Sequence, residues 1–200
     1  MKVIGLCGSS GSGKGYVSRT FLKFGVPSID TDRVYREITT KKGTPCLCEL
    51  VLEFGEQILD TNGELDKKAL ASIVFEGEGS RERLDKLNKI THKHIKMDTE
   101  KILSEYKNEG KRAAIIDAPV LFESGFDKMC DFTVCVTAPY ELKLERIISR
   151  DGILKEKAEA RLKNQLNDDE LVRLTTYQID NSNCELDLQI ENILKKENII

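Results

Sequence analysis

Residues 8–14 constrain this chain of 200 residues more than any other stretch. They read Gly-Ser-Ser-Gly-Ser-Gly-Lys and fit the pattern G-x-x-x-x-G-K, between an apolar run that ends at Cys7 and a segment with helical periodicity. Glycines let the backbone wrap closely around an anion, and the N–H groups of such a loop lie at the positive end of the following helix. The sequence therefore predicts a strand, a phosphate-binding loop and a helix, which together open a parallel α/β fold.

The candidate nucleotide site covers this loop and the first residues after the lysine. Its members are Gly8, Ser9, Ser10, Gly11, Ser12, Gly13, Lys14, Gly15 and Tyr16. Lys14 is expected to reach the β- and γ-phosphates as a point charge. The next residue is usually Ser or Thr, whose hydroxyl holds Mg²⁺, but here it is Gly15. Either water replaces that hydroxyl, or Mg²⁺ binding is impaired.

Further strands and helices alternate along the rest of the chain. Apolar runs predict four more strands, at 26–29, 113–116, 132–136 and 177–179. Helical periodicity or a helix-starting proline marks the segments 14–24, 45–54, 66–75, 81–106, 139–150, 155–164 and 185–196. We expect one domain whose core covers about 1–38 and 112–200, interrupted by a helical insert at about 40–110.

Charge and hydropathy exclude two classes of protein. The net charge is −3 and the isoelectric point is near 5.6, whereas a protein that binds bulk nucleic acid shows a basic excess. No run approaches the roughly 18 apolar residues of a membrane span, and the N-terminal apolar stretch is too short for a signal peptide. We therefore expect a cytoplasmic protein with no nucleic-acid or membrane partner.

The six cysteines show neither CxxC pairs nor metal-ligand spacing. They are Cys7, Cys46, Cys48, Cys130, Cys135 and Cys184. All but Cys184 have apolar neighbours in the sequence, which is typical of free, buried thiols. We expect no disulfide.

Acidic residues follow two of the predicted strands. Asp30 and Asp32 flank Thr31 beyond the strand at 26–29, and Asp117 follows the strand at 113–116. Ligands of an open parallel sheet gather at the carboxyl ends of its strands. A carboxylate there can accept a proton from an attacking hydroxyl or hold Mg²⁺ through water. For Asp30 and Asp32 the alternative is an N-cap of the helix that begins near Arg33.

Other charged residues indicate a functional site less specifically. Arg146 and Arg150 share a helix face at i and i+4, and Arg161 lies on the next charged helix. Such arginines can stabilise a transferred phosphoryl group when a lid closes, or they can form a solvated helix face. Glu123 is either a site residue or a charge at a helix start. His92 and His94 are two residues apart and cannot form an i, i+4 metal pair.

Taken in order, these motifs resemble the dephospho-CoA kinase family over nearly the whole chain. Besides the phosphate loop, the resemblance rests on Asp30-Thr31-Asp32, Phe54-Gly55, Asn62-Gly63, Val74-Phe75, His92, Pro119-Val120-Leu121-Phe122-Glu123, Arg146 to Arg150, Arg161 to Gln165 and Asp180-Asn181. The family has Ser or Thr at Gly15, proline at Lys93 and arginine at Lys67. The last difference weakens a bidentate contact to substrate.

The resemblance implies a P-loop kinase with a three-layer α/β fold, a five-stranded parallel sheet, a helical CoA-binding insert and a lid at about 151–167. It implies Asp32 as the base for the ribose 3′-hydroxyl of dephospho-CoA, helped by Lys14, Arg146 and Arg161. Substrate contacts are expected from Asp32, Lys67, His92, Pro119, Leu121 and Glu123. Asp117 and Asp30 are the expected Mg²⁺ ligands, and ATP is the phosphate donor.

Two other interpretations remain. One is a nucleoside or nucleotide kinase of the same fold. The other is an ATP-binding relative in which Gly15 has impaired catalysis. Dephospho-CoA and ATP are the expected partners, and we expect a monomer or a weak oligomer.

Overall fold

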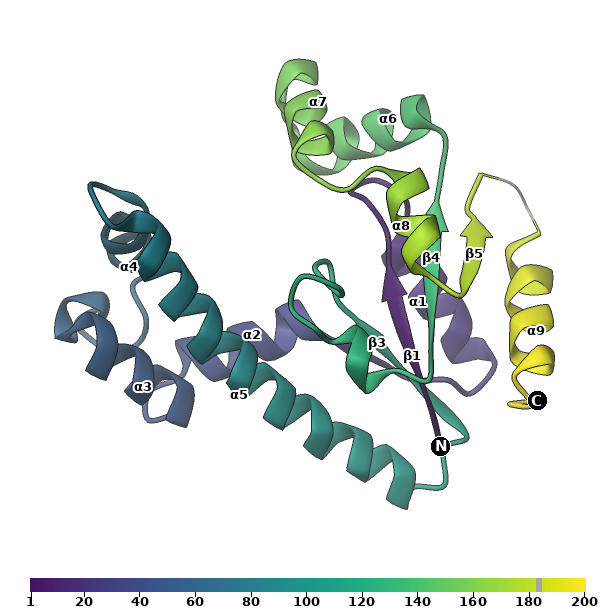
Figure 1. Ribbon diagram of the computed structural model, residues 1–200, viewed down its shortest axis with the longest axis horizontal. Helices are drawn as coiled ribbons and strands as arrows, with labels where there is room; N and C mark the ends of the chain where they lie inside the picture. The colour runs from purple at the N-terminus through teal and green to yellow at the C-terminus, as the bar shows by residue number, and fades with distance from the viewer. Residues whose placement is uncertain (183–184) are drawn as a thin grey trace. The chain divides into compact units, whose positions relative to one another are not determined.

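The computed structural model describes residues 1–182 and 185–200, and these form two compact units. The first unit contains 1–29 and 103–200, and the second contains 30–102. Figure 1 shows the helices and strands in chain order. No helix in the described residues has the length and apolar content needed to cross a bilayer.

Five strands form one sheet in the order β2-β3-β1-β4-β5. Their bounds are β1 Lys2–Cys7, β2 Ser28–Asp30, β3 Ala113–Asp117, β4 Phe132–Thr137 and β5 Tyr177–Asp180. β1 pairs in parallel with both β3 and β4, and β4 pairs in parallel with β5. The register sets Leu6 beside Asp117 and Cys7 beside Cys135. The predicted α/β fold with a five-stranded parallel sheet is confirmed.

The helices follow the predicted order with two additions. They are α1 Lys14–Lys23, α2 Thr31–Thr40, α3 Pro45–Phe54, α4 Lys67–Phe75, α5 Ser80–Asn108, α6 Tyr140–Asp151, α7 Lys155–Lys163, α8 Asp168–Leu174 and α9 Leu186–Lys196, with short 3₁₀ turns η1 Glu56–Ile58 and η2 Asp127–Met129. The sequence predicted only the start of α2 and missed α8. Asn167 caps α8 in a capping box with Glu170.

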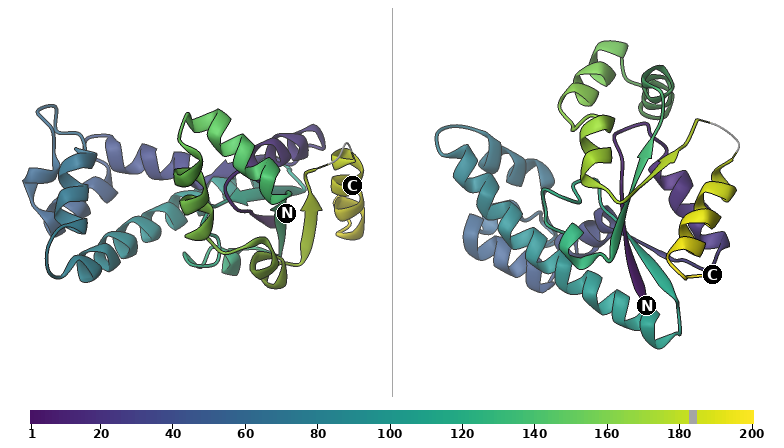
Figure 2. Two further views of the ribbon diagram at one scale, coloured as in Figure 1. Left: turned by 90° about the horizontal axis from the view of Figure 1, so that it is seen from above. Right: turned by 45° about the vertical axis from the view of Figure 1, so that its right-hand side comes forward.

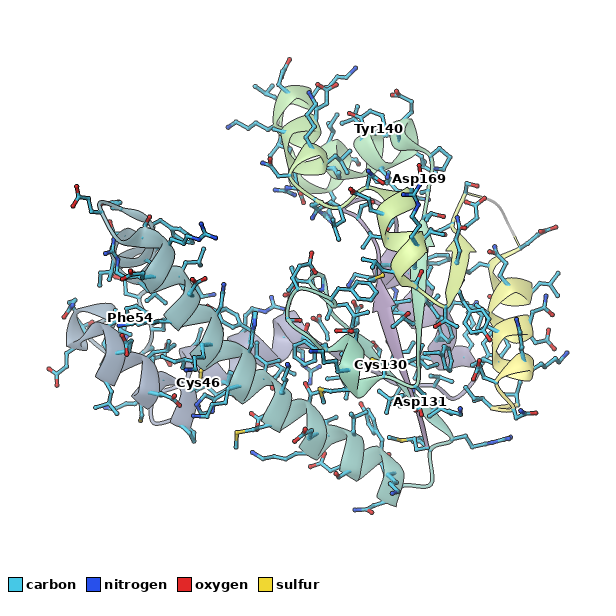
Figure 3. The ribbon with its side chains drawn as sticks, in the orientation of Figure 1. Cys46, Phe54, Cys130, Asp131, Tyr140 and Asp169 are labelled. Atoms are coloured by element: carbon cyan, nitrogen blue, oxygen red, sulfur yellow. The ribbon has the colours of Figure 1, made fainter. Side chains whose placement is uncertain are left out.

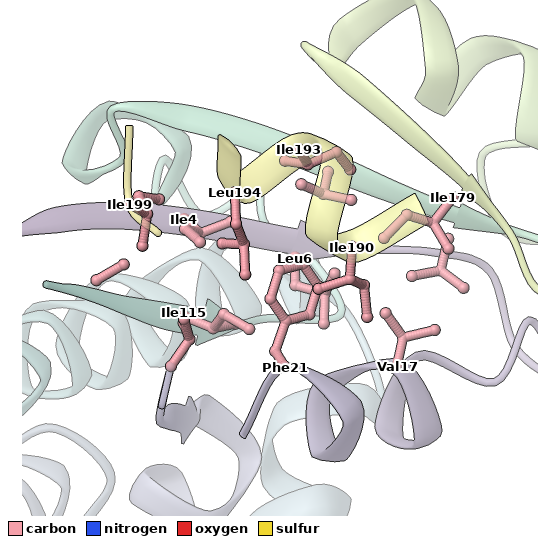
Figure 4. Close-up of a cluster of buried hydrophobic side chains, with 14 of the residues drawn as sticks. Ile4, Leu6, Val17, Phe21, Ile115, Ile179, Ile190, Ile193, Leu194 and Ile199 are labelled. Carbon is pink, nitrogen blue, oxygen red and sulfur yellow. The ribbon is translucent and has the colours of Figure 1, made fainter. Parts of the chain in front are cut away.

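One hydrophobic core lies between the sheet and the helices α1 and α9. Figure 4 shows strand residues such as Ile4, Leu6 and Ile115 packed with Phe21 of α1 and Ile190 of α9. α1 and α9 lie side by side in both views of Figure 2. α8 packs against β4 and lies in front of it in Figure 1. This packing fixes the start of α1, and with it the loop that precedes it.

The α6–α7 pair has a small core of its own. Leu144 and Ile147 of α6 are buried with Ala158 of α7, and Ile153 packs against them. Gly152 ends α6 in a left-handed conformation at φ 61°, which reverses the chain direction.

The second unit is helical, with local caps that explain its elements. Thr44 caps α3, whose first residue is Pro45, and Asp66 caps α4. Its apolar interior is made of Leu47, Leu50, Phe54, Ile58, Leu70, Val74, Ile90 and Ile95.

The cysteines differ in part from expectation. Cys7, Cys46 and Cys135 are buried, and Cys130 is half-buried with its Sγ donating to the Phe126 carbonyl at 3.3 Å. The prediction that Cys48 is buried is wrong, because it lies on the exposed face of α3. The five described cysteines are free thiols, and Cys184 lies outside the described residues.

Candidate phosphate-transfer site

The loop Gly8–Gly13 joins the carboxyl end of β1 to the N-terminus of α1. Gly11 and Gly13 adopt φ of 79° and 87°, which a residue with a Cβ rarely adopts. A Cβ at Gly11 would collide with the Lys143 carbonyl, and one at Gly13 with the Asn181 side-chain nitrogen. The glycines are therefore required both by conformation and by close packing. The loop presents its N–H groups at a helix N-terminus, the arrangement that binds phosphate.

Lys14 and Asp117 form an ion pair at the strand ends. The adjacent strands β1 and β3 bring them together, although they are 103 residues apart in the sequence. Both side chains are largely buried, with 18% and 11% of their surface exposed. A cation and a carboxylate thus face one another beside the loop, where a nucleotide phosphate and its counterion would compete for them.

Arg146 and Asn181 hold the loop from outside. The Arg146 guanidinium donates to the carbonyls of Gly11 and Ser12, both at 3.2 Å, and to the Asn181 carbonyl at 3.1 Å. The Asn181 side chain donates to the Ser12 carbonyl at 2.8 Å. These bonds hold the carbonyls of Gly11 and Ser12 from α6 and from the residue that follows β5. In this structure Arg146 supports the loop, and its direct part in catalysis stays a prediction.

Arg150 and Arg161 share one carboxylate in the α6–α7 pair. Arg150 donates to both Asp151 oxygens, at 2.7 and 2.9 Å, and Arg161 forms an ion pair with the same side chain. Hydrogen bonding to Arg150 holds the pKa of the Asp151 carboxyl below its usual range. The structure thus gives Arg150 and Arg161 a common acidic partner, which the sequence had not indicated.

A cavity of about 980 Å³ opens beside Gly8 and Ser9. Its lining comes from the segment after β3, the start of α6, and the residues from the end of α7 into α8: Pro119, Val120, Glu123, Tyr140, Lys143, Leu162, Lys163, Asn164, Gln165, Leu166, Asn167, Glu170 and Leu171. Figure 3 shows Tyr140 at the start of α6 and Asp169 at the start of α8. The space is large enough for a small organic ligand next to the phosphate loop.

Two of the three residues predicted after β3 line this cavity. Pro119 and Glu123 do so, whereas Leu121 is only 1% exposed and belongs to the core. Leu121 packs toward Gly5 of β1, where an added Cβ would lie 2.9 Å from it. The prediction that Leu121 contacts substrate is therefore wrong. The neighbouring Val120, which the sequence reasoning did not select, is 47% exposed and lines the cavity instead.

The remaining predicted site residues belong to the second unit. Asp30 is the N-cap of α2, and its Oδ1 accepts the N–H groups of Asp32 and Arg33 at 2.9 and 3.1 Å. Asp32 is exposed in the first turn, so its carboxylate is available to a ligand. Lys67 is exposed in the first turn of α4.

The two histidines of α5 differ in their surroundings. His92 is half-buried, and burial together with Lys96 lowers its pKa, which favours the neutral ring. His94 Nε2 pairs with Glu49 at 2.7 Å, a contact between α5 and α3 within the second unit.

The comparisons with known proteins decide the family. The family model described as dephospho-CoA kinase matches residues 2–187. The chain belongs to the dephospho-CoA kinase family. A dephospho-CoA kinase of Fusobacterium nucleatum is 39% identical over 194 residues, which are 97% of this chain and 94% of that one. One of Bacillus cereus is 36% identical over 200 residues, covering 99% and 98%.

Solved structures support the same fold. A Thermus thermophilus crystal structure superposes with a TM-score of 0.81 at 27% identity, covering 100% of this chain and 98% of that one. Dephospho-CoA kinase from Campylobacter jejuni gives 0.68 at 24% identity, covering 98% and 96%. Shikimate kinase from Acinetobacter baumannii gives 0.53 at 16% identity, covering 99% and 93%, which is a likeness of fold.

Members of such a kinase family use Mg²⁺ with ATP, and the residues here fit that ion. Mg²⁺ in phosphate-transfer sites is held by one or two carboxylates, substrate phosphates and several waters. Asp117 supplies a carboxylate next to Lys14. At Gly15 an added Cβ would find no atom closer than Arg19 Nη1 at 3.8 Å, which leaves room for water. Within the described residues no three His, Cys, Asp or Glu side chains form a ready-made cage.

Proposed function

We propose that this protein transfers the γ-phosphate of ATP to the ribose 3′-hydroxyl of dephospho-CoA, giving coenzyme A and ADP. The observation that carries this proposal is the glycine loop with Lys14 and Asp117 beside it, in a chain that matches the family over residues 2–187. The cavity beside Gly8 and Ser9 supports an acceptor site next to the donor phosphates.

In the proposed mechanism the acceptor oxygen attacks the γ-phosphorus, and the bond from that phosphorus to the β-phosphate oxygen breaks. Asp32 accepts the hydroxyl proton, for which its exposed carboxylate is suited. Lys14 and the loop N–H groups balance the charge on the phosphates. ADP leaves with the electron pair of the broken bond.

The other predicted residues are proposed to bind the substrates or Mg²⁺, or to belong to the lid. Pro119 and Glu123 contact the acceptor from the cavity wall. Lys67 and His92 contact the CoA portion from the second unit. Arg161 joins the lid over ATP. Mg²⁺, held by Asp117 and Asp30 through water, would neutralise phosphate charge. We also propose a cytoplasmic location and a monomeric state.

The first test is ADP release from ATP and Mg²⁺, with and without dephospho-CoA. Acceptor-dependent release by the wild type is the expected result. ADP release with another nucleoside or nucleotide, and none with dephospho-CoA, would contradict the proposal that dephospho-CoA is the acceptor. ATP binding without transfer to any acceptor would favour the second candidate, a nucleotide-binding relative, whose supporting observation is Gly15.

The second test is Asp32→Asn, which keeps the shape of the side chain and removes its basicity. We expect turnover to fall by at least about 10²-fold, the usual lower bound for a general base. ATP affinity, measured by calorimetry, should stay unchanged. A parallel loss of ATP affinity would contradict the assignment of Asp32 as the base.

A further inference from the structure

Two charged side chains outside the predicted site, Lys143 and Asp168, form a closed triangle with Ser9 of the phosphate loop. The Lys143 ammonium donates to Asp168 Oδ1 at 2.9 Å and to Ser9 Oγ at 3.2 Å. The Ser9 hydroxyl donates to the same Asp168 oxygen at 2.8 Å. Lys143 comes from α6, Asp168 is the first residue of α8, and Ser9 is the second residue of the loop. All three belong to the first unit.

The triangle is largely shielded from water. Lys143 is 7% exposed and Ser9 is also 7% exposed, while the Asp168 side chain is 22% exposed. A buried ammonium without a partner is strongly unfavourable, so the Asp168 carboxylate stabilises Lys143 in its buried position. Because that carboxylate is also the acceptor for Ser9, the position of the Ser9 side chain is tied to the ion pair.

α6 and the segment that leads into α8 also hold the following loop residues. The Ser10 N–H donates to Gln165 Oε1 at 2.9 Å, three residues before Asp168. The Lys143 backbone lies directly against Gly11, and Arg146, one turn later on α6, holds the carbonyls of Gly11 and Ser12. Every loop residue from Ser9 to Ser12 is therefore fixed by α6 or by the segment that leads from the lid into α8.

These contacts distinguish a positioning role from a direct contact with phosphate. A phosphate in a loop of this kind is bound by backbone N–H groups and Lys14. The Lys143 ammonium instead contacts the Ser9 hydroxyl and a carboxylate. Although Lys143 also lines the cavity, its ammonium is engaged by these two partners, which favours an effect on a bound nucleotide through the loop.

We propose that Lys143 and Asp168 are a positioning pair for phosphoryl transfer. Their ion pair fixes Ser9, and so the first half of the phosphate loop, in its ATP-binding shape. It also ties the start of α8 to that loop. This inference rests on the proposed function only in that the loop binds the phosphates of ATP.

The test compares Lys143→Met, Asp168→Asn and the double variant with the wild type. Each single variant should weaken ATP binding by about tenfold, the factor expected from loss of one charge-assisted hydrogen bond. KM for dephospho-CoA should stay within about twofold. The double variant should lose no more ATP affinity than the weaker-binding single variant, because the two residues act as one pair.

Three further variants separate positioning from general stability. Lys143→Arg keeps the charge and should restore most of the ATP affinity. Ser9→Ala removes the hydroxyl link without leaving a buried charge, so it should fold and still lower ATP affinity severalfold. Lys195→Met removes a lysine from an exposed ion pair with Glu191 on α9 and should leave all constants unchanged.

ATP affinity is measured by calorimetry without acceptor, on protein shown to be folded by circular dichroism. Unchanged ATP affinity in folded Lys143→Met or Ser9→Ala would overturn the inference and leave only a structural ion pair. If the wild type bound ATP but did not turn over dephospho-CoA, the proposed substrate would be refuted, whereas the inference about Lys143 and Asp168 would stand. Failure of the wild type to bind ATP would overturn both.

Discussion

At the scale of single residues, Gly15 stands where a phosphate loop of this kind usually has Ser or Thr. It lies in the first turn of α1, is exposed, and has a φ outside the left-handed region. An added side chain would meet only Arg19 Nη1, at 3.8 Å from its Cβ. Nothing in the fold therefore requires glycine here, in contrast to Gly11 and Gly13.

We predict that Gly15→Ser lowers the Mg²⁺ concentration needed for half-maximal activity severalfold, because the hydroxyl supplies an oxygen ligand. The substitution should also raise the free energy of unfolding by about 0.5 kcal/mol, since serine is the better helix former. Gly15→Ala is the matched control: it gains helix stability without the oxygen, and its Mg²⁺ requirement should equal that of the wild type. Equal Mg²⁺ curves for the serine and alanine variants would contradict the role of the hydroxyl.

A second prediction for single residues concerns Tyr177, whose hydroxyl donates to Glu197 Oε1 at 2.6 Å. This hydrogen bond, with burial, raises the pKa of Tyr177 to about 12. The neutral phenol is therefore favoured more strongly in the folded state than in the unfolded state, where the pKa of a tyrosine hydroxyl is about 10. The resulting stability is complete below about pH 10 and is lost as the pH rises through about 12.

Urea unfolding between about pH 9 and 12 tests this in the wild type and in Tyr177→Phe. The phenylalanine keeps the ring that packs edge-on against Phe132 and lies 5.1 Å from the Lys196 ammonium. An aromatic ring therefore lies beside the Lys196 ammonium in both proteins. The wild type should lose stability more steeply over this range, and parallel curves would show that the hydrogen bond contributes nothing.

At the scale of secondary-structure elements, α9 illustrates how one face of a helix fixes the site from a distance. Ile190 is fully buried in the core shared with α1, whereas Leu188 on the same helix is 53% exposed. α1 begins at Lys14, so the packing of α9 on α1 supports the phosphate loop.

We predict that Ile190→Ala lowers the free energy of unfolding by about 2–5 kcal/mol, through lost burial and the cavity that remains. Leu188→Ala should change it by no more than about 0.5 kcal/mol, as at other exposed sites. Chemical denaturation of both variants measures the difference. Similar losses in the two would mean that α9 does not pack in the register seen here.

The elements also show what sequence can predict. The strands and most helices were predictable because their signals are local: apolar runs, prolines at helix starts and glycines at helix ends. α8 was missed because it is short and acidic, although Asn167 and Glu170 gave a capping-box signal. Within the site, the loop and Asp117 were found from local patterns. The contacts of Lys143, Asp168 and Asn181 with the loop span more than 130 residues, and no local pattern encodes them.

At the scale of the whole molecule, the predicted ATP site and the predicted base belong to different units. Lys14 and its loop lie in the unit of residues 1–29 and 103–200, and Asp32 lies in the unit of residues 30–102. A ligand stabilises whatever folded part binds it, by mass action. ATP binding therefore reports on the first unit without depending on the chemistry of Asp32.

We predict that ATP at about 100 times its dissociation constant stabilises the wild type by about 2.7 kcal/mol, which raises the unfolding temperature by roughly 5–10 °C for a chain of this size. Asp32→Asn should show the same rise, because its exposed carboxylate takes no part in holding the nucleotide. Lys14→Met should show little or none, since it removes the cation nearest the phosphates. Scanning calorimetry with and without ATP distinguishes these cases. If ATP raised the unfolding temperature of Lys14→Met as much as that of the wild type, ATP would bind away from the loop. If ATP did not raise the unfolding temperature of Asp32→Asn, Asp32 would be a nucleotide ligand instead of the base.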